Sequence, residues 1–94
     1  MTDKEIVLTK ENLFYYLSKS QLGRAIELID NLLTQVQDGY YGDEVYELKT
    51  NYKRMLQYMF YGVNDPEQHL VYQHLLKETY EIGEHLADKL LQLN

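Results

Sequence analysis

The sequence contains no cysteine and no tryptophan, and its 94 residues include a single proline and two phenylalanines. Without cysteine the chain forms neither disulfides nor thiolate metal sites, which is compatible with a reducing compartment. A Gly-rich phosphate loop and a Gly-x-Ser-x-Gly nucleophile motif are absent as well. We therefore expect a protein that is not an enzyme and that needs no cofactor.

Basic residues are also scarce, since nine Lys and Arg stand against fifteen Asp and Glu and give a net charge of −6. The densest basic cluster is only Lys49, Lys53 and Arg54. Nucleic acids and anionic membranes bind clustered cations, so the pattern argues against both as partners. No apolar run approaches the about 18 residues of a membrane span, and the first residues lack the layout of a signal peptide. The expected location is cytoplasmic.

Tyrosine, in contrast, is abundant, with ten residues in the chain. A tyrosine ring buries a large area while its hydroxyl stays in water, so it suits the edge of a small core and also a surface where proteins meet. Two interpretations stay open for the tyrosines outside the predicted core faces, namely peripheral packing within the domain or an aromatic contact surface. These residues are Tyr15, Tyr16, Tyr40, Tyr41, Tyr46, Tyr58 and Tyr61.

The second half of the chain predicts two long amphipathic helices. Apolar residues recur at spacings of three and four, first over about 44–61 with Asp43 as the N-cap, and then over about 66–91. With a short link these helices must lie antiparallel. Gly83 and Ala87, one turn apart, would let a neighbouring helix approach closely. The face expected to pack against Leu75, Ile82 and Leu86 consists of Val45, Leu48, Tyr52, Met55 and Met59, with Leu56 and Phe60 widening it.

The turn between these helices is predicted at Gly62, which suits the left-handed position that ends a helix. Val63 would then pack back on Tyr58. Pro66 suits the first turn of the next helix, and Asp65 with Gln68 resembles a capping box.

The first half predicts two shorter helices. One is opened by Ser20 and closes near Gly39, and the other is short and follows Thr9 as its cap. Residues 1–8 are open between an extension of this helix toward Asp3 and an ordered arm. Residues 38–43 are expected to form a loop between the two pairs. The fold class is all-α, with a short antiparallel hairpin followed by a long antiparallel pair in a single domain over residues 1–94. Because the last residues carry no stop signal, we expect the N-terminal part of a larger protein.

A limited resemblance to a known family lies in residues 13–33. The run Leu13-Phe14-(x2)-Leu17-(x7)-Ala25-Ile26-(x)-Leu28-(x3)-Leu32-Leu33 resembles half of a tetratricopeptide-type helical hairpin, in which a small residue of the second helix seats against the first. The whole layout is also similar to small helical adaptor domains at the ends of larger bacterial regulatory proteins. Both resemblances imply a protein-binding or capping role without catalytic residues.

The most suggestive chemical group is a stripe of His74, Glu78, Glu81 and His85, spaced by four, three and four residues. Such a stripe could hold a metal, but it lacks the paired Glu-x-x-His pattern of helical di-iron sites. It also lies roughly opposite the apolar face of its helix. We therefore expect a solvated face and no metal site.

The candidate protein-binding residues are Tyr40, Tyr41, Tyr58, Phe60 and Tyr61, which we expect to form two separate patches at opposite ends of one helix. The expected function is a non-enzymatic interaction or capping module that meets a protein partner or an adjoining domain. The alternative is a self-associating structural bundle that forms a homodimer, and a small-molecule-binding regulator is a third hypothesis. At least a weak homodimer of the isolated chain is expected in either case.

Overall fold

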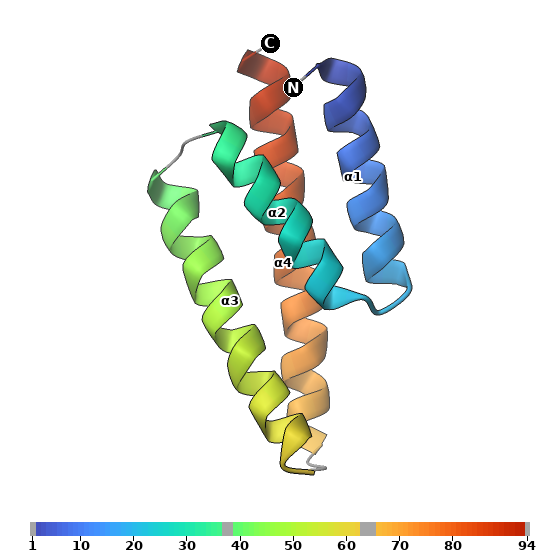
Figure 1. Cartoon of the computed structure of the whole chain (residues 1–94), viewed down its shortest axis with the longest axis vertical. Helices are drawn as coiled ribbons and strands as arrows, with labels where there is room; N and C mark the ends of the chain where they lie inside the picture. Colours follow the sequence, from blue (N-terminus) through green and yellow to red (C-terminus); the bar gives the residue numbers. More distant parts are fainter. Residues whose placement is uncertain (1, 37–38, 63–65, 94) are drawn as a thin grey trace.

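The computed structural model describes residues 2–36, 39–62 and 66–93, and its regular structure there is helical throughout. The chain runs alternately down and up through four helices (Figure 1), which are α1 (Asp3–Ser18), α2 (Leu22–Val36), α3 (Gly39–Phe60) and α4 (Pro66–Leu93). This arrangement confirms the predicted short antiparallel hairpin followed by a long antiparallel pair. Within the described residues, no helix combines the length and hydropathy needed to cross a lipid bilayer.

Helix α4 is the centre of the fold. It contacts α1, α2 and α3, whereas among the described residues α1 and α3 do not contact one another. Helix α2 lies across α4 between α1 and α3 (Figure 1), and the Cα trace spans 45 × 26 × 16 Å. The molecule is therefore a flattened bundle with two broad faces.

The core is one cluster to which all four helices contribute. Leu48, Val45 and Met55 of α3 are buried, as predicted, and so are Leu75, Ile82 and Leu86 of α4. Met59 is 59% exposed, so its prediction as a core residue is wrong. The reason is geometric, because α3 and α4 extend beyond the end of α2 that begins at Leu22 (Figure 1).

A glycine on α4 allows close helix packing. Gly83 is buried, and a Cβ built there would overlap Cδ2 of Leu13 and lie 3.6 Å from Cγ1 of Ile29. Ala87, one turn later, is fully buried. The predicted close approach is thus confirmed, and the helices that exploit it are α1 and α2.

Helix α1 begins earlier than Thr9, the predicted cap. Its N-cap is Thr2, whose hydroxyl accepts a hydrogen bond from the Glu5 backbone N–H (3.2 Å) while the Glu5 carboxylate accepts one from the Thr2 N–H (3.4 Å). This capping box satisfies two N–H groups and holds the pKa of Glu5 below its usual value through the hydrogen bonds from Thr2. Thr9 instead donates to the Glu5 carbonyl inside the helix. Of the two alternatives for residues 1–8, the helical extension is the one observed.

The turn between α1 and α2 also differs from its prediction. Ser20 does not open α2, because it has a positive φ of 58° and α2 starts at Leu22. The Ser20 N–H donates to the Leu17 carbonyl and the Gln21 N–H donates to the Tyr16 carbonyl. These two bonds are the Schellman ending of a helix, with serine in the position that glycine usually occupies.

Helix α3 begins at Gly39, so the predicted loop over residues 39–43 is helical and Asp43 lies inside the helix. The loop was predicted because glycine is a poor helix former and this segment contains Gly39 and Gly42. A contact with α4 compensates for this low helix propensity, since the Tyr41 ring packs against His85 with ring centroids 6.3 Å apart. Asp38 lies outside the described residues.

The predicted turn at Gly62 is confirmed. Helix α3 ends at Phe60, Gly62 has φ of 73°, and its N–H donates to the Met59 carbonyl (3.1 Å). Pro66 begins α4, which ends two residues beyond the predicted Leu91. The expected contact of Val63 and the capping box built on Asp65 fall outside the described residues.

Substitution of Gly62 by valine should destabilise the protein by more than about 1 kcal/mol, because a β-branched residue resists positive φ. Apart from the adjacent residues, no described atom lies within 4 Å of a Cβ built at Gly62, so the expected cost is conformational. The matched control is Ser20→Gly, which relieves the same strain and should stabilise by about 0.5–1 kcal/mol. Urea unfolding measures both; an unchanged Gly62→Val variant would contradict the assigned conformation.

Candidate functional site

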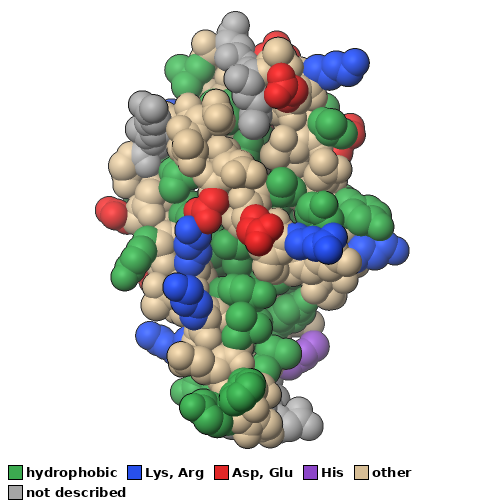
Figure 2. Space-filling model, in the orientation of Figure 1, with side chains coloured by type: hydrophobic (Ala, Val, Ile, Leu, Met, Phe, Trp, Pro, Cys, Tyr) green, Lys and Arg blue, Asp and Glu red, His purple; other side chains and the backbone are tan. Residues whose placement is uncertain are grey.

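The most exposed aromatic residues lie where α3 ends. We call Tyr58, Met59, Phe60 and Tyr61 the aromatic tip. Phe60 is 87% exposed and Tyr61 78% exposed, and their rings pack edge to face with centroids 5.7 Å apart. Apolar side chains gather at this end of the molecule in Figure 2. The tip therefore presents a preformed aromatic pair to solvent.

The second predicted patch, Tyr40 and Tyr41, lies at the other end of α3. The two rings contact edge to face at 5.3 Å, and Tyr40 is 68% exposed. The Tyr40 hydroxyl hydrogen-bonds the Glu44 carboxylate, which raises the pKa of Tyr40 above its usual value. Tyr41 is half-buried, and its hydroxyl lies 3.4 Å from Nδ1 of His85. Tyr40 is thus available for contact, whereas Tyr41 mainly fastens α3 to α4.

The two patches are separate. Tyr40 and Phe60 are twenty positions apart on α3, which corresponds to about 30 Å along an α-helix. Tyr58 belongs to the tip by sequence, but its side chain also lines a groove between α3 and α4.

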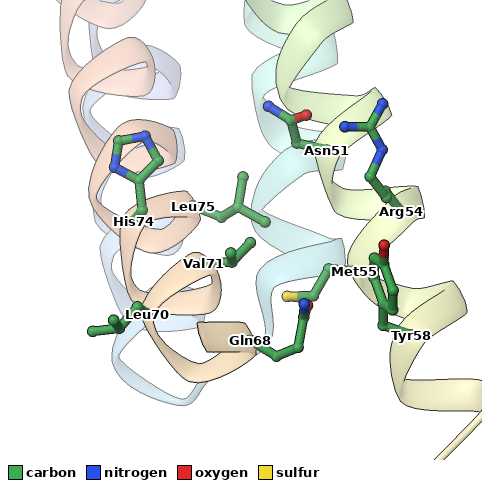
Figure 3. A pocket seen from close by; sticks show the side chains of 9 residues that line it. All are labelled: Asn51, Arg54, Met55, Tyr58, Gln68, Leu70, Val71, His74 and Leu75. Atoms are coloured by element: carbon green, nitrogen blue, oxygen red, sulfur yellow. The ribbon is translucent and has the colours of Figure 1, made fainter. Parts of the chain in front are cut away.

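This lower groove has a volume of about 440 Å³. Figure 3 shows it between the two long helices, with Arg54 and Tyr58 on α3 and Val71 and His74 on α4. Leu70, which is largely exposed, lies on the same helix. Among the residues that the structure describes, its lining contains one permanent cation and no carboxylate, in a chain whose net charge is −6.

The lower groove lies on the face of the α3–α4 pair that points away from α2, which we call the open face. Tyr52 and Lys49 of α3 contact α2, through Gly23 and Asp30 respectively. Arg54 is two residues beyond Tyr52, a rotation of about 200° on an α-helix. The opposite side of α3 is therefore the one that lines the groove.

An upper groove of about 360 Å³ continues along the open face toward the other end of the pair. Its lining residues on α4 follow those of the lower groove at helical spacing, with Glu78 one turn beyond His74 and then Glu81 and His85. On α3 its lining includes Glu44 and Tyr40. The upper groove is therefore acidic where the lower groove is basic.

The predicted His and Glu stripe accordingly forms part of the open face. Unlike a face in which every side chain is free in solvent, this stripe contains a side-chain contact, because His74 Nε2 lies 3.6 Å from a Glu78 carboxylate oxygen. Glu78 is also half-buried. Across residues 2–36, 39–62 and 66–93, no three His, Asp or Glu side chains converge as metal ligands would.

The remaining tyrosines divide between the two interpretations left open by the sequence. Tyr16 is partly buried and packs on the core. Tyr15 and Tyr46 are exposed, and Lys19 Nζ lies over the Tyr15 ring, 5.9 Å from its centroid.

What sequence reasoning missed is the lower groove. Its α3 residues include Asn51, Arg54 and Tyr58, which are spaced by three and four, but only the pairing with α4 reveals a concave surface.

No protein-family model matches this chain, and no curated protein or solved structure gives a significant match.

Proposed function

We propose that this chain is a non-enzymatic protein-interaction or capping module whose aromatic tip meets a protein partner or an adjoining domain. The exposed pair of Phe60 and Tyr61 carries the proposal. Two large rings held in water at a helix end leave apolar area unburied, and aromatic residues are enriched at the centres of protein interfaces. A partner that covers the tip would bury that area.

Charge and composition support the same function. The net charge of −6 disfavours nucleic acid and anionic membrane surfaces, and the cysteine-free composition suits a cytoplasmic location. The likeness of residues 13–33 to a tetratricopeptide-type hairpin agrees with a binding role. The proposal includes no cofactor and no catalytic residue.

The second candidate function is a self-associating structural bundle. The open face favours it, because α1 and α2 cover only the opposite face of the α3–α4 pair. A dimer through the long helices would bury the apolar parts of both grooves.

A photo-crosslinking amino acid placed at Phe60 tests the first candidate in the source cells. We expect a discrete adduct with another protein at position 60, and none at Tyr46, a tyrosine of α3 that is 75% exposed and lies away from the tip. Equal labelling at both positions would contradict the proposal. An adduct of twice the chain mass would favour the second candidate.

The tip should also be dispensable for folding. Since both rings are exposed, Phe60→Ser with Tyr61→Ser should change the free energy of unfolding by less than about 0.5 kcal/mol, while the adduct formed from a crosslinker at Tyr58 disappears. A large loss of stability in urea unfolding would show that the tip is part of the core instead.

A further inference from the structure

The two ends of the open face carry opposite charge. The upper groove is lined by Glu44, Glu78 and Glu81, whereas the described residues that line the lower groove include Arg54 and no carboxylate. Among the described residues, no carboxylate lies within ion-pair distance of Arg54. A surface that is acidic at one end and basic at the other is complementary to itself when one copy is reversed.

We infer that a second copy of this chain docks on the open face in antiparallel orientation, so that the lower groove of each copy receives the upper end of the other. This inference rests on the second proposed function, self-association, and adds the surface, the orientation and the residues that select it. The exposed pair of Phe60 and Tyr61 is not required for it.

Electrostatics decides the orientation. If two open faces met with their helices parallel, Glu44 would face the Glu78 and Glu81 end of the second copy, and Arg54 would face His74. Like charges would then meet at the acidic end, which opposes docking. The reversed orientation instead brings Arg54 of each copy to the acidic end of the other.

The register follows from the position of the charges along α3. Arg54 and Glu44 lie equally far from position 49, about 7.5 Å on either side. A two-fold axis crossing α3 at position 49 therefore sets Arg54 of one copy opposite Glu44 of the other. The same axis sets Tyr58 opposite Tyr40. Each copy thus offers an exposed aromatic ring to the apolar side of the other copy's lower groove.

The open face is large enough for a specific dimer. Two adjacent helices present a strip about 20 Å wide, and α3 is about 33 Å long, so docking buries about 660 Å² on each copy. The total of about 1,300 Å² lies within the range of specific protein interfaces. The flat shape of the molecule, 16 Å across its shortest axis, lets this face meet its equal without obstruction.

Sedimentation velocity on charge-reversed variants tests the inference. Arg54→Glu should weaken the homodimer at least about tenfold, because a two-fold interface places two carboxylates against two others. Glu44→Arg should weaken it similarly. The double variant Glu44→Arg with Arg54→Glu restores both pairs with reversed sign, and we expect its dimer affinity to return to within about threefold of the original.

Two controls match the change in charge. Lys53→Glu alters the neighbouring residue, which lines neither groove, and Glu27→Arg alters an exposed carboxylate of α2. Both should leave the dimer affinity within about threefold. Circular dichroism melting of every variant establishes that the fold is retained.

The outcomes separate the inference from the functions on which it rests. Loss in both single variants with recovery in the double variant supports the antiparallel interface. A dimer indifferent to both reversals overturns it but keeps self-association, through the tip or another face. A strict monomer at millimolar concentration overturns both self-association and this interface, and leaves the open face to a helix of another protein.

Discussion

Leu48→Ala should lower the free energy of unfolding by about 2–5 kcal/mol, since removal of a fully buried leucine side chain loses transfer free energy and leaves a cavity. Leu48 has no exposed surface and belongs to the core cluster to which all four helices contribute. A small domain has about 5–15 kcal/mol of total stability, so this loss would remove a large fraction of it.

The matched control is Leu56→Ala on the same helix. Leu56 is 42% exposed, and its truncation should cost less than about 1 kcal/mol. Urea unfolding at low protein concentration measures both variants. Equal losses of unfolding free energy at the two positions would mean that Leu56 is as buried as Leu48, which contradicts the structure.

Gly83→Val should destabilise by about 3 kcal/mol or more. Its Cβ would overlap Cδ2 of Leu13, which is itself buried, and the two further methyl groups enter a region already filled by Ile29. Overpacking of this kind costs about 1–3 kcal/mol even for one added methylene. Gly83→Ala should show the same sign with a smaller effect, although alanine is the better helix former by about 1 kcal/mol.

Gly42→Ala supplies the opposite expectation. Gly42 also lies inside a helix, but nothing is within 4 Å of a Cβ built there, so the variant should be stabilised by about 0.5–1 kcal/mol. Thermal and urea unfolding of the two alanine variants give the comparison directly. Stabilisation at both positions would show that α1 and α4 can separate without cost.

The features that sequence predicted well are those with a local cause. The end of α3 at Gly62 and the start of α4 at Pro66 each rest on the conformational preference of a single residue. The capping box of Thr2 and Glu5 is equally local and could have been found, because a threonine followed three residues later by glutamate is its signature.

Other features depended on contacts that no local pattern reveals. Helix formation over 39–43 relies on Tyr41 packing against α4, which overrides the poor propensity of two glycines. The apolar periodicity of α3 continues through Met59, past the point where α2 stops covering the helix. A periodic pattern identifies the apolar face of a helix, but it does not show how far along the helix a neighbouring helix packs. Among the candidate sites, Phe60 and Tyr61 were proposed from the sequence, but Phe60 was also placed on the packed face of α3, and its 87% exposure contradicts that placement. The lower groove requires two helices side by side and was not predicted.

The central position of α4 has a consequence for how the chain folds. Its contacts with α1 join residues far apart in sequence, as the ion pair between Lys10 and Asp88 shows, with nitrogen and oxygen 3.3 Å apart. On the ribosome, α1, α2 and α3 emerge before the helix that all three must contact. Contacts of long sequence separation slow folding, because a loop must close before any of them forms. Until residues 66–93 have been synthesised, the nascent chain therefore exposes the apolar surface of α1, α2 and α3 that α4 covers in the folded protein, and that interval is when a chaperone would have most to bind.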